Sequence, residues 1–143
     1  MAAERTAQVT WTGSLMDGAG RIESVGSGAF GPLDVTWGSR AEESEGRTSP
    51  EELIAAAHAA CFSMSLSHGL AQAGSPPERL ETQATVTFVP GTGVTKSELT
   101  VRATVPGIDE AAFLEQAEAA KAGCPVSKAL AGVPEITLDA ALA

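Results

Sequence analysis

A long uncharged stretch, from Leu53 to Gly74, constrains the fold of this chain more than any other feature. The helix that contains this stretch is expected to begin just before it, with Ser49 as N-cap, Pro50 at the first helical position and Glu52 as the return arm of a capping box. Its apolar residues cover every side of the helix, namely Leu53, Ile54, Ala55, Ala57, Ala60, Phe62, Met64 and Leu66. A helix without a polar face predicts a buried central helix, and Cys61 lies in its middle.

Length and charge narrow the class of protein. At 143 residues the chain is expected to form one domain, residues 1–143. Its 18 acidic against 9 basic residues give a net charge of -9, which argues against nucleic acid and anionic membrane surfaces as partners. The start of the chain, MAAERTAQVTW, lacks the apolar region of a secretory signal, so a cytoplasmic location is expected.

The uncharged stretch is also about long enough to span a bilayer. It contains two histidines and several serines, and much of the rest is alanine, which makes poor lipid-facing surface. We therefore expect a buried helix of a soluble protein and no membrane partner.

Alternating apolar residues and turn signals predict an α+β domain in the order β-β-β-α-β-β-α-β, built from antiparallel sheets packed on the central helix. The segment 38–47 is expected to be a loop, and the central helix to end near Gly69 or Gly74. Asp109 is expected to cap a second helix through Lys121, and Cys124 to cap a short helix that starts at Pro125. The expected strands are Gln8–Thr12, Arg21–Val25, Leu33–Trp37, Leu80–Phe88, Leu99–Val105 and Glu135–Leu142.

Two cysteines, Cys61 and Cys124, are the candidate reactive groups. In a reducing compartment such a pair favours a catalytic or redox role, although two inert buried thiols remain an alternative. The helix dipole favours a Cys124 thiolate, whereas burial raises the pKa of the Cys61 thiol. A reactive Cys61 therefore needs a cation, for which the candidates are Arg40, Arg21, Arg47 and His58.

The spacing of the histidines and cysteines gives little support to two other kinds of site, a Cys/His nucleophile pair and a zinc site. His58 lies three residues before Cys61, which invites a Cys/His nucleophile pair, but no Asn or Asp that would orient the histidine is evident. A zinc site of His58, Cys61, Cys124 and His68 lacks the short Cys/His intervals of known zinc sites. We expect no metal and no other cofactor.

Motifs around both cysteines resemble the OsmC/Ohr family, named after osmotically inducible protein C and organic hydroperoxide resistance. These are SPEELIAAAHAACFSMSLS around Cys61, AKAGCPVSKAL around Cys124, VPGID before the second helix, and the final EITLD. The AAHAACFSM version is closer to the osmotically inducible protein C branch. The resemblance covers nearly the whole chain and implies an OsmC-like fold in an intertwined homodimer.

The family resemblance also implies roles for individual residues. Cys61 matches the peroxidatic cysteine, which attacks the O–O bond and becomes a sulfenic acid, and Cys124 matches the resolving cysteine, which forms a disulfide with it. Glu51 matches the carboxylate that holds the active-site arginine; Arg40 is the first candidate for that arginine and Arg21 the second. The implied substrate is an organic hydroperoxide, favoured by apolar neighbours such as Phe62, Met64 and Phe113, and the implied reductant is a dithiol, of lipoyl type rather than thioredoxin.

Helix geometry adds two constraints. In a continuous helix Glu51 lies about 15 Å along the axis from Cys61, so both can serve one site only in a dimer. A Cys61–Cys124 disulfide requires Cα atoms within about 7 Å, so the short helix after Gly123 must pack beside the middle of the central helix. The alternative function is a non-enzymatic or redox-sensing stress protein on the same fold.

Overall fold

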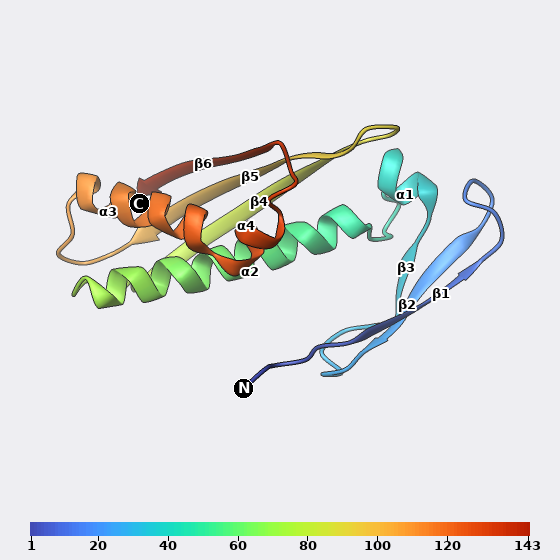
Figure 1. The fold of residues 1–143 in the computed structure, drawn as a ribbon, viewed down its shortest axis with the longest axis horizontal. Helices are drawn as coiled ribbons and strands as arrows, with labels where there is room; N and C mark the ends of the chain where they lie inside the picture. Colours follow the sequence, from blue (N-terminus) through green and yellow to red (C-terminus); the bar gives the residue numbers. More distant parts are fainter. The chain divides into compact units, whose positions relative to one another are not determined.

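The computed structural model describes residues 1–143, which divide into two compact units, Met1–Leu53 and Ile54–Ala143. The order of elements in Figure 1 is β1, β2, β3, α1, α2, β4, β5, α3, α4 and β6. The α+β class expected from the sequence is confirmed. That residues 1–143 form a single domain stays a prediction, and each unit is described by itself.

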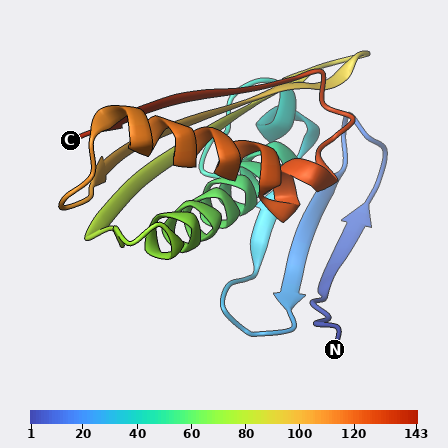
Figure 2. The same ribbon diagram turned by 60° about the vertical axis from the view of Figure 1, so that its left-hand side comes forward.

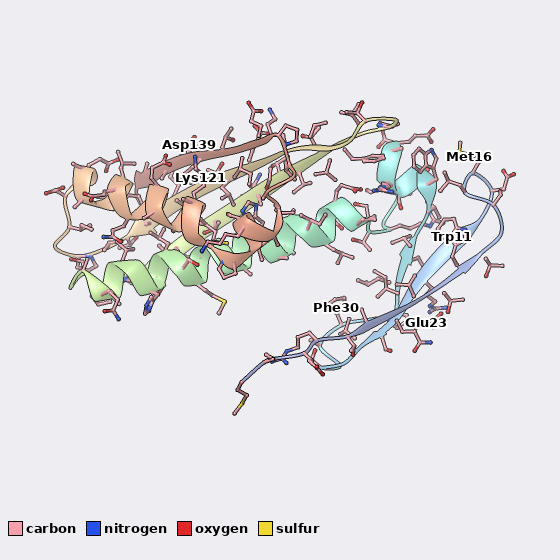
Figure 3. All side chains as sticks on the ribbon, viewed as in Figure 1. Trp11, Met16, Glu23, Phe30, Lys121 and Asp139 are labelled. Atoms are coloured by element: carbon pink, nitrogen blue, oxygen red, sulfur yellow. The ribbon has the colours of Figure 1, made fainter.

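The first unit is a three-stranded antiparallel meander of β1 (Ala7–Thr12), β2 (Ala19–Val25) and β3 (Leu33–Val35). β1 and β2 agree with the strands expected at the start of the chain to within two residues. The meander buries little of its own apolar surface, because Ile22 is the only large apolar side chain buried in it. Figure 3 shows the sticks of Trp11, Met16 and Phe30, which are exposed in this unit.

One expectation for the first unit is wrong. The predicted strand Leu33–Trp37 ends at Val35, and Trp37–Ala41 forms a short helix, α1, within what was expected to be strand and loop. A reciprocal capping box explains the difference, since the Ser39 N–H donates to Thr36 Oγ1 (3.0 Å) and the Thr36 N–H to Ser39 Oγ (2.9 Å).

The central helix α2 spans Pro50–Gln72 without interruption. Its Ser49 cap is confirmed, because Ser49 Oγ accepts from the N–H of Glu52 at 3.1 Å. The Glu52 carboxylate does not form the expected return arm and accepts instead from the Thr48 hydroxyl at 2.8 Å. Beyond the helix, Gly74 has a φ of 89°, a left-handed conformation that suits glycine at a helix C-terminus.

The second unit is a three-stranded sheet of β4 (Arg79–Val89), β5 (Gly93–Thr104) and β6 (Glu135–Leu142). β4 and β5 form the expected hairpin, but β6 pairs parallel to β5, so this sheet is mixed rather than purely antiparallel. Between β5 and β6 the chain forms α3 (Glu110–Gly123) and α4 (Pro125–Ala129). Figures 1 and 2 show α2 and α3 side by side on one face of the sheet.

The core of the second unit lies between that face and the two helices. One stripe of α2 is buried there, at four-residue spacing through His58, Phe62, Leu66 and Leu70. The expected inward face of β5 is confirmed, with Leu99, Val101, Ala103 and the adjoining Val105 buried.

The opposite side of α2 is apolar yet uncovered in a single chain. It carries Ala56, Ala57 and Ala60, all exposed, and Met64, which is 74% exposed. By length and composition α2 is also the one helix that could cross a membrane, with a mean hydropathy of 1.3, a criterion that core helices of soluble proteins meet as well. This exposed, alanine-rich face of α2 is a surface that a partner could bury.

Candidate active site

Cys61 lies half-buried on α2, in contact with the core of the second unit. Burial raises the pKa of its thiol, and the neighbouring Cys124 raises it further, while the N–H of Val126 and the hydroxyl of Ser65 act in the opposite direction. Within Ile54–Ala143, no Lys or Arg side chain is buried. The unit therefore favours the neutral thiol at Cys61, as the sequence predicts for a buried cysteine without a cation.

Cys124 is fully buried at the junction between α3 and α4. Its N–H donates to the carbonyl of Ala120 (2.9 Å), and its carbonyl accepts from the N–H of Lys128 (3.1 Å), so it ends one helix and caps the next. Burial alone would raise the pKa of the Cys124 thiol, but the neighbouring polar groups of Ser127, Cys61 and the Val126 backbone lower it below its ordinary value. This direction also agrees with the expectation for a cysteine at a helix N-terminus.

Cys61 and Cys124 are neighbours, because each thiol shifts the pKa of the other, and no disulfide joins them. α4 consequently lies beside the middle of α2, as the sequence-based constraint required. A sulfenic acid on Cys61 would form within reach of the second sulfur. Neighbouring thiols are what disulfide formation requires.

His58 has a different place from the one that its spacing suggests. It is fully buried, and its ring nitrogens bind two serines rather than Cys61: Nδ1 lies 2.7 Å from Ser97 Oγ and Nε2 2.8 Å from Ser127 Oγ. Burial lowers the pKa of the imidazole, which is therefore neutral at neutral pH and cannot supply the cation that Cys61 lacks. No three His, Cys, Asp or Glu side chains are grouped to hold a metal ion.

Sequence reasoning missed Ser97 and Ser127. A signal for each was present, because Ser97 occupies the inward register of β5 with Leu99 and Val101, and Ser127 follows Cys124 by three residues in a short helix. A polar residue at an inward position of a strand requires a buried partner. Which residue would be that partner depends on tertiary packing.

Arg40 and Glu51 form a close ion pair within the first unit. Arg40 Nε lies 2.9 Å from Glu51 Oε1, and Nη2 lies 2.9 Å from Oε2, a bidentate arrangement around a carboxylate that is only 6% exposed. The pair is positioned locally, because the Ser39 hydroxyl donates to the Thr48 carbonyl (2.9 Å) and links α1 to the segment before α2.

Arg21, the second candidate, lies elsewhere in the same unit. Its Nε is 4.0 Å from an oxygen of Asp34, and both side chains are more than half exposed. Arg47 lies 3.5 Å from Glu45, also at the surface. Arg40 is thus the candidate arginine that contacts Glu51.

The apolar residues suggested as substrate contacts differ in their exposure. Phe62 and Phe113 are fully buried in the core of the second unit, whereas Met64 is exposed. The two phenylalanines therefore stabilise the fold and do not line an open site. Met64 borders an open groove of about 640 Å³ between α2 and the start of β4, which contains neither cysteine.

Comparison with known proteins places this geometry in a family. A family model described as OsmC-like protein matches residues 42–139. The chain is 42% identical over 142 residues to peroxiredoxin OsmC of Escherichia coli strain K12, an alignment that covers 97% of this chain and 96% of the relative; the same values hold for peroxiredoxin OsmC of Shigella flexneri.

Solved structures share the fold. The organic hydroperoxide resistance protein OhrB of Bacillus subtilis superposes with a TM-score of 0.69 at 27% identity, covering 95% of this chain and 98% of that chain. An OsmC-like protein from Mycoplasma pneumoniae superposes with a TM-score of 0.73 at 14% identity, covering 99% of both chains.

Proposed function

Because the chain belongs to the OsmC-like family and is a Cys-based peroxidase, we propose that it reduces organic hydroperoxides to alcohols with Cys61 as nucleophile and Cys124 as resolving cysteine. The observation that carries this proposal is the pair of neighbouring free cysteines, Cys61 on α2 and Cys124 at the start of α4, each of which shifts the pKa of the other. The organic substrate is supported by the 27% identical OhrB of Bacillus subtilis, named for organic hydroperoxide resistance.

The reaction has three steps. The Cys61 thiolate attacks the O–O bond of the hydroperoxide, so sulfur gains one oxygen as a sulfenic acid and the alkoxide takes a proton to leave as an alcohol. The Cys124 sulfur then attacks the Cys61 sulfur, the S–S bond forms, and the sulfenic hydroxyl leaves as water. A dithiol reductant, proposed to be of lipoyl type, restores both thiols by exchange.

The first step requires a cation, because burial keeps Cys61 protonated in the isolated chain. We assign that role to Arg40, held by Glu51. A guanidinium cannot lose its proton and offers several donors, so it can both stabilise a thiolate and orient a peroxide oxygen. Arg21 remains the alternative arginine.

A homodimer would bring these groups together. Ten positions of continuous helix separate Glu51 from Cys61, about 15 Å of rise, so a Glu51-held arginine serves the thiol of a second copy in this proposal. The exposed alanine and Met64 face of α2 supplies apolar surface for such an interface. A cytoplasmic location is part of the same proposal, since a reducing compartment would keep both thiols free.

The test is peroxide consumption by prereduced protein. Wild-type protein should consume cumene hydroperoxide stoichiometrically and hydrogen peroxide more slowly. Cys61→Ser should consume none, and Cys124→Ser should complete a single turnover and stop at the sulfenic acid. A wild-type protein that consumes no hydroperoxide would favour the non-enzymatic or redox-sensing alternative.

A further inference from the structure

The second unit buries three polar side chains, and all three belong to one hydrogen-bonded chain. His58 on α2 bridges Ser97 on β5 and Ser127 on α4, at 2.7 Å and 2.8 Å. His58 and Ser97 are fully buried and Ser127 is 6% exposed. The chain ends beside Cys124, because Ser127 lies three residues after Cys124 in the first turn of α4, and it is among the groups that lower the pKa of the Cys124 thiol.

This group of residues, which we call the His58 chain, costs more to bury than apolar side chains of equal size. Each polar group must lose its water, and a buried network stabilises the fold only when every member has a partner. That condition is met, since no buried side-chain nitrogen or oxygen lacks a hydrogen bond. Apolar side chains would fill the same space at lower cost, so packing alone does not account for a polar network beside the Cys124 sulfur.

The chemistry of a neutral imidazole gives the His58 chain a direction. One ring nitrogen carries a hydrogen and donates, and the other accepts. When the Ser97 hydroxyl donates to Nδ1, Nε2–H donates to Ser127 Oγ, and the Ser127 hydroxyl hydrogen is left to point at Cys124. In the other tautomer Ser127 donates to Nε2 and turns its lone pairs toward the sulfur. The first arrangement suits a thiolate and the second a thiol.

We propose that His58 and Ser97 are positioning residues for disulfide formation, which hold the Ser127 hydroxyl as a hydrogen-bond donor to the Cys124 sulfur when that sulfur becomes the attacking thiolate. The inference rests on the proposed role of Cys124 as resolving cysteine. In that step Cys124 loses its proton, its sulfur displaces the sulfenic hydroxyl from Cys61, and the released hydroxide and proton form water. The His58 chain moves no net proton; it stabilises negative charge on the sulfur during the transfer.

Only neutral groups around Cys124 are placed to stabilise negative charge on its sulfur. The titratable side chains that contact it or its hydrogen-bond partners are Cys61 and His58, both on α2. On α3, Lys121 lies 3.3 Å from Glu118, and on α4 Lys128 is exposed. No Asp, Glu, Lys or Arg of Ile54–Ala143 is buried, so no full charge competes with the Ser127 hydroxyl in the core.

The first experiment measures the pKa of Cys124 without any turnover. In a Cys61→Ser background Cys124 is the only thiol, and its ionisation can be followed by thiolate ultraviolet absorbance against pH. Ser127→Ala should raise the pKa of Cys124 by about one unit, the scale of one hydrogen bond to a charged group. Ser97→Ala, which has no contact with the sulfur, should raise it by a few tenths, and Ser97→Thr should restore it.

Ser63→Ala is the matched control. The Ser63 hydroxyl also bonds a second hydroxyl across α2 and the sheet, that of Thr82 at 2.7 Å, but it belongs to a separate pair outside the His58 chain. Its loss should leave the pKa of Cys124 unchanged. Circular dichroism and thermal melting identify any variant that does not fold, and the conservative Ser127→Thr and Ser97→Thr variants then supply the comparison. Folded Ser127→Ala and Ser97→Ala proteins with the pKa of the parent would overturn the inference.

The second experiment separates this inference from the proposed function. Prereduced protein with both cysteines receives one equivalent of cumene hydroperoxide, and acid quenching with mass spectrometry follows sulfenic acid and disulfide in time. Ser127→Ala should slow conversion of sulfenic acid to disulfide about tenfold at pH values below the pKa of Cys124, because the thiolate fraction falls tenfold. Absence of sulfenic acid in wild-type protein would reject the proposed function. Sulfenic acid followed by disulfide at the wild-type rate in the alanine variants would reject the role of the His58 chain.

Discussion

The two units of the chain are stabilised in different ways. The second unit packs α2 and α3 on a sheet around a core of apolar side chains, and its buried polar groups are all neutral. The first unit buries one large apolar side chain, Ile22, and its one buried charged residue is Glu51, which is paired with Arg40. One unit thus provides a water-poor place for two thiols, and the other provides a preformed guanidinium and carboxylate.

In the proposed mechanism, neither unit suffices for the first step of the reaction. A thiol buried among neutral groups keeps its proton, which agrees with the raised pKa of Cys61. Arg40, half-buried and paired with Glu51, has no thiol to activate within the first unit. If the proposed function is correct, peroxidase activity depends on bringing the charged pair of the first unit to Cys61, and the predictions below test that dependence.

The largest effect is expected for Arg40→Ala. Loss of a cation that stabilises charge in the transition state should lower kcat/KM for cumene hydroperoxide by about 10²–10³ and raise the pKa of Cys61. Arg21→Ala is the control, because Arg21 is exposed and lies 4.0 Å from Asp34. A large loss in Arg21→Ala with little change in Arg40→Ala would transfer the role to Arg21.

Glu51→Gln should have a smaller effect. The substitution keeps the size of the side chain but removes the charge and one of the two acceptor oxygens that hold Arg40, so the guanidinium is positioned less well. We expect kcat/KM to fall about tenfold. Glu45→Gln, which weakens the surface pair with Arg47, should leave kcat/KM unchanged. Equal rates in both variants would remove Glu51 from the site.

Mixed proteins test whether the arginine and the thiol come from different copies. Cys61→Ser and Arg40→Ala proteins, each inactive alone, are unfolded together and refolded. Random pairing should recover about one quarter of wild-type activity, because half of the dimers would contain one intact site of two. Failure to recover activity, with dimers present by sedimentation, would place both groups in one chain.

The smallest predicted effect concerns stability and the second unit alone. Burial lowers the pKa of His58, so between the folded and unfolded pKa values the unfolded state binds a proton that the folded state does not. The free energy of unfolding should therefore fall as the pH drops below about 6.5, by at most about 1.4 kcal/mol per pH unit from this group. Urea unfolding from about pH 7.5 to about pH 5 measures the slope.

His58→Gln should remove that part of the slope, and His68→Gln, on an exposed part of α2, should not. A wild-type slope no steeper than that of His58→Gln would mean that the pKa of His58 is not lowered in the folded protein. Below that pKa both ring nitrogens would donate, and the His58 chain could no longer orient the Ser127 hydroxyl.

Much of the local structure could be predicted because its causes are local. The Ser49 and Asp109 caps, the hairpin of β4 and β5, and the bounds of β6 follow from patterns within a few residues. The prediction was wrong at Trp37. Its place in the apolar alternation with Leu33 and Val35 favoured a strand, but the Thr36–Ser39 capping box formed a helix. Both signals were local, and the capping box was the stronger.

The sequence by itself determined the family, the α+β class, the two cysteines as candidate reactive groups and the opposite tendencies of their pKa values, because these depend on motifs, helix ends and burial patterns. Only the tertiary structure decided which side chains meet. His58 reaches partners 39 and 69 residues away, Arg40 rather than Arg21 pairs with Glu51, and β6 runs parallel to β5. Such contacts depend on strand register and helix packing, which bring distant residues together and leave no periodic signal in the chain.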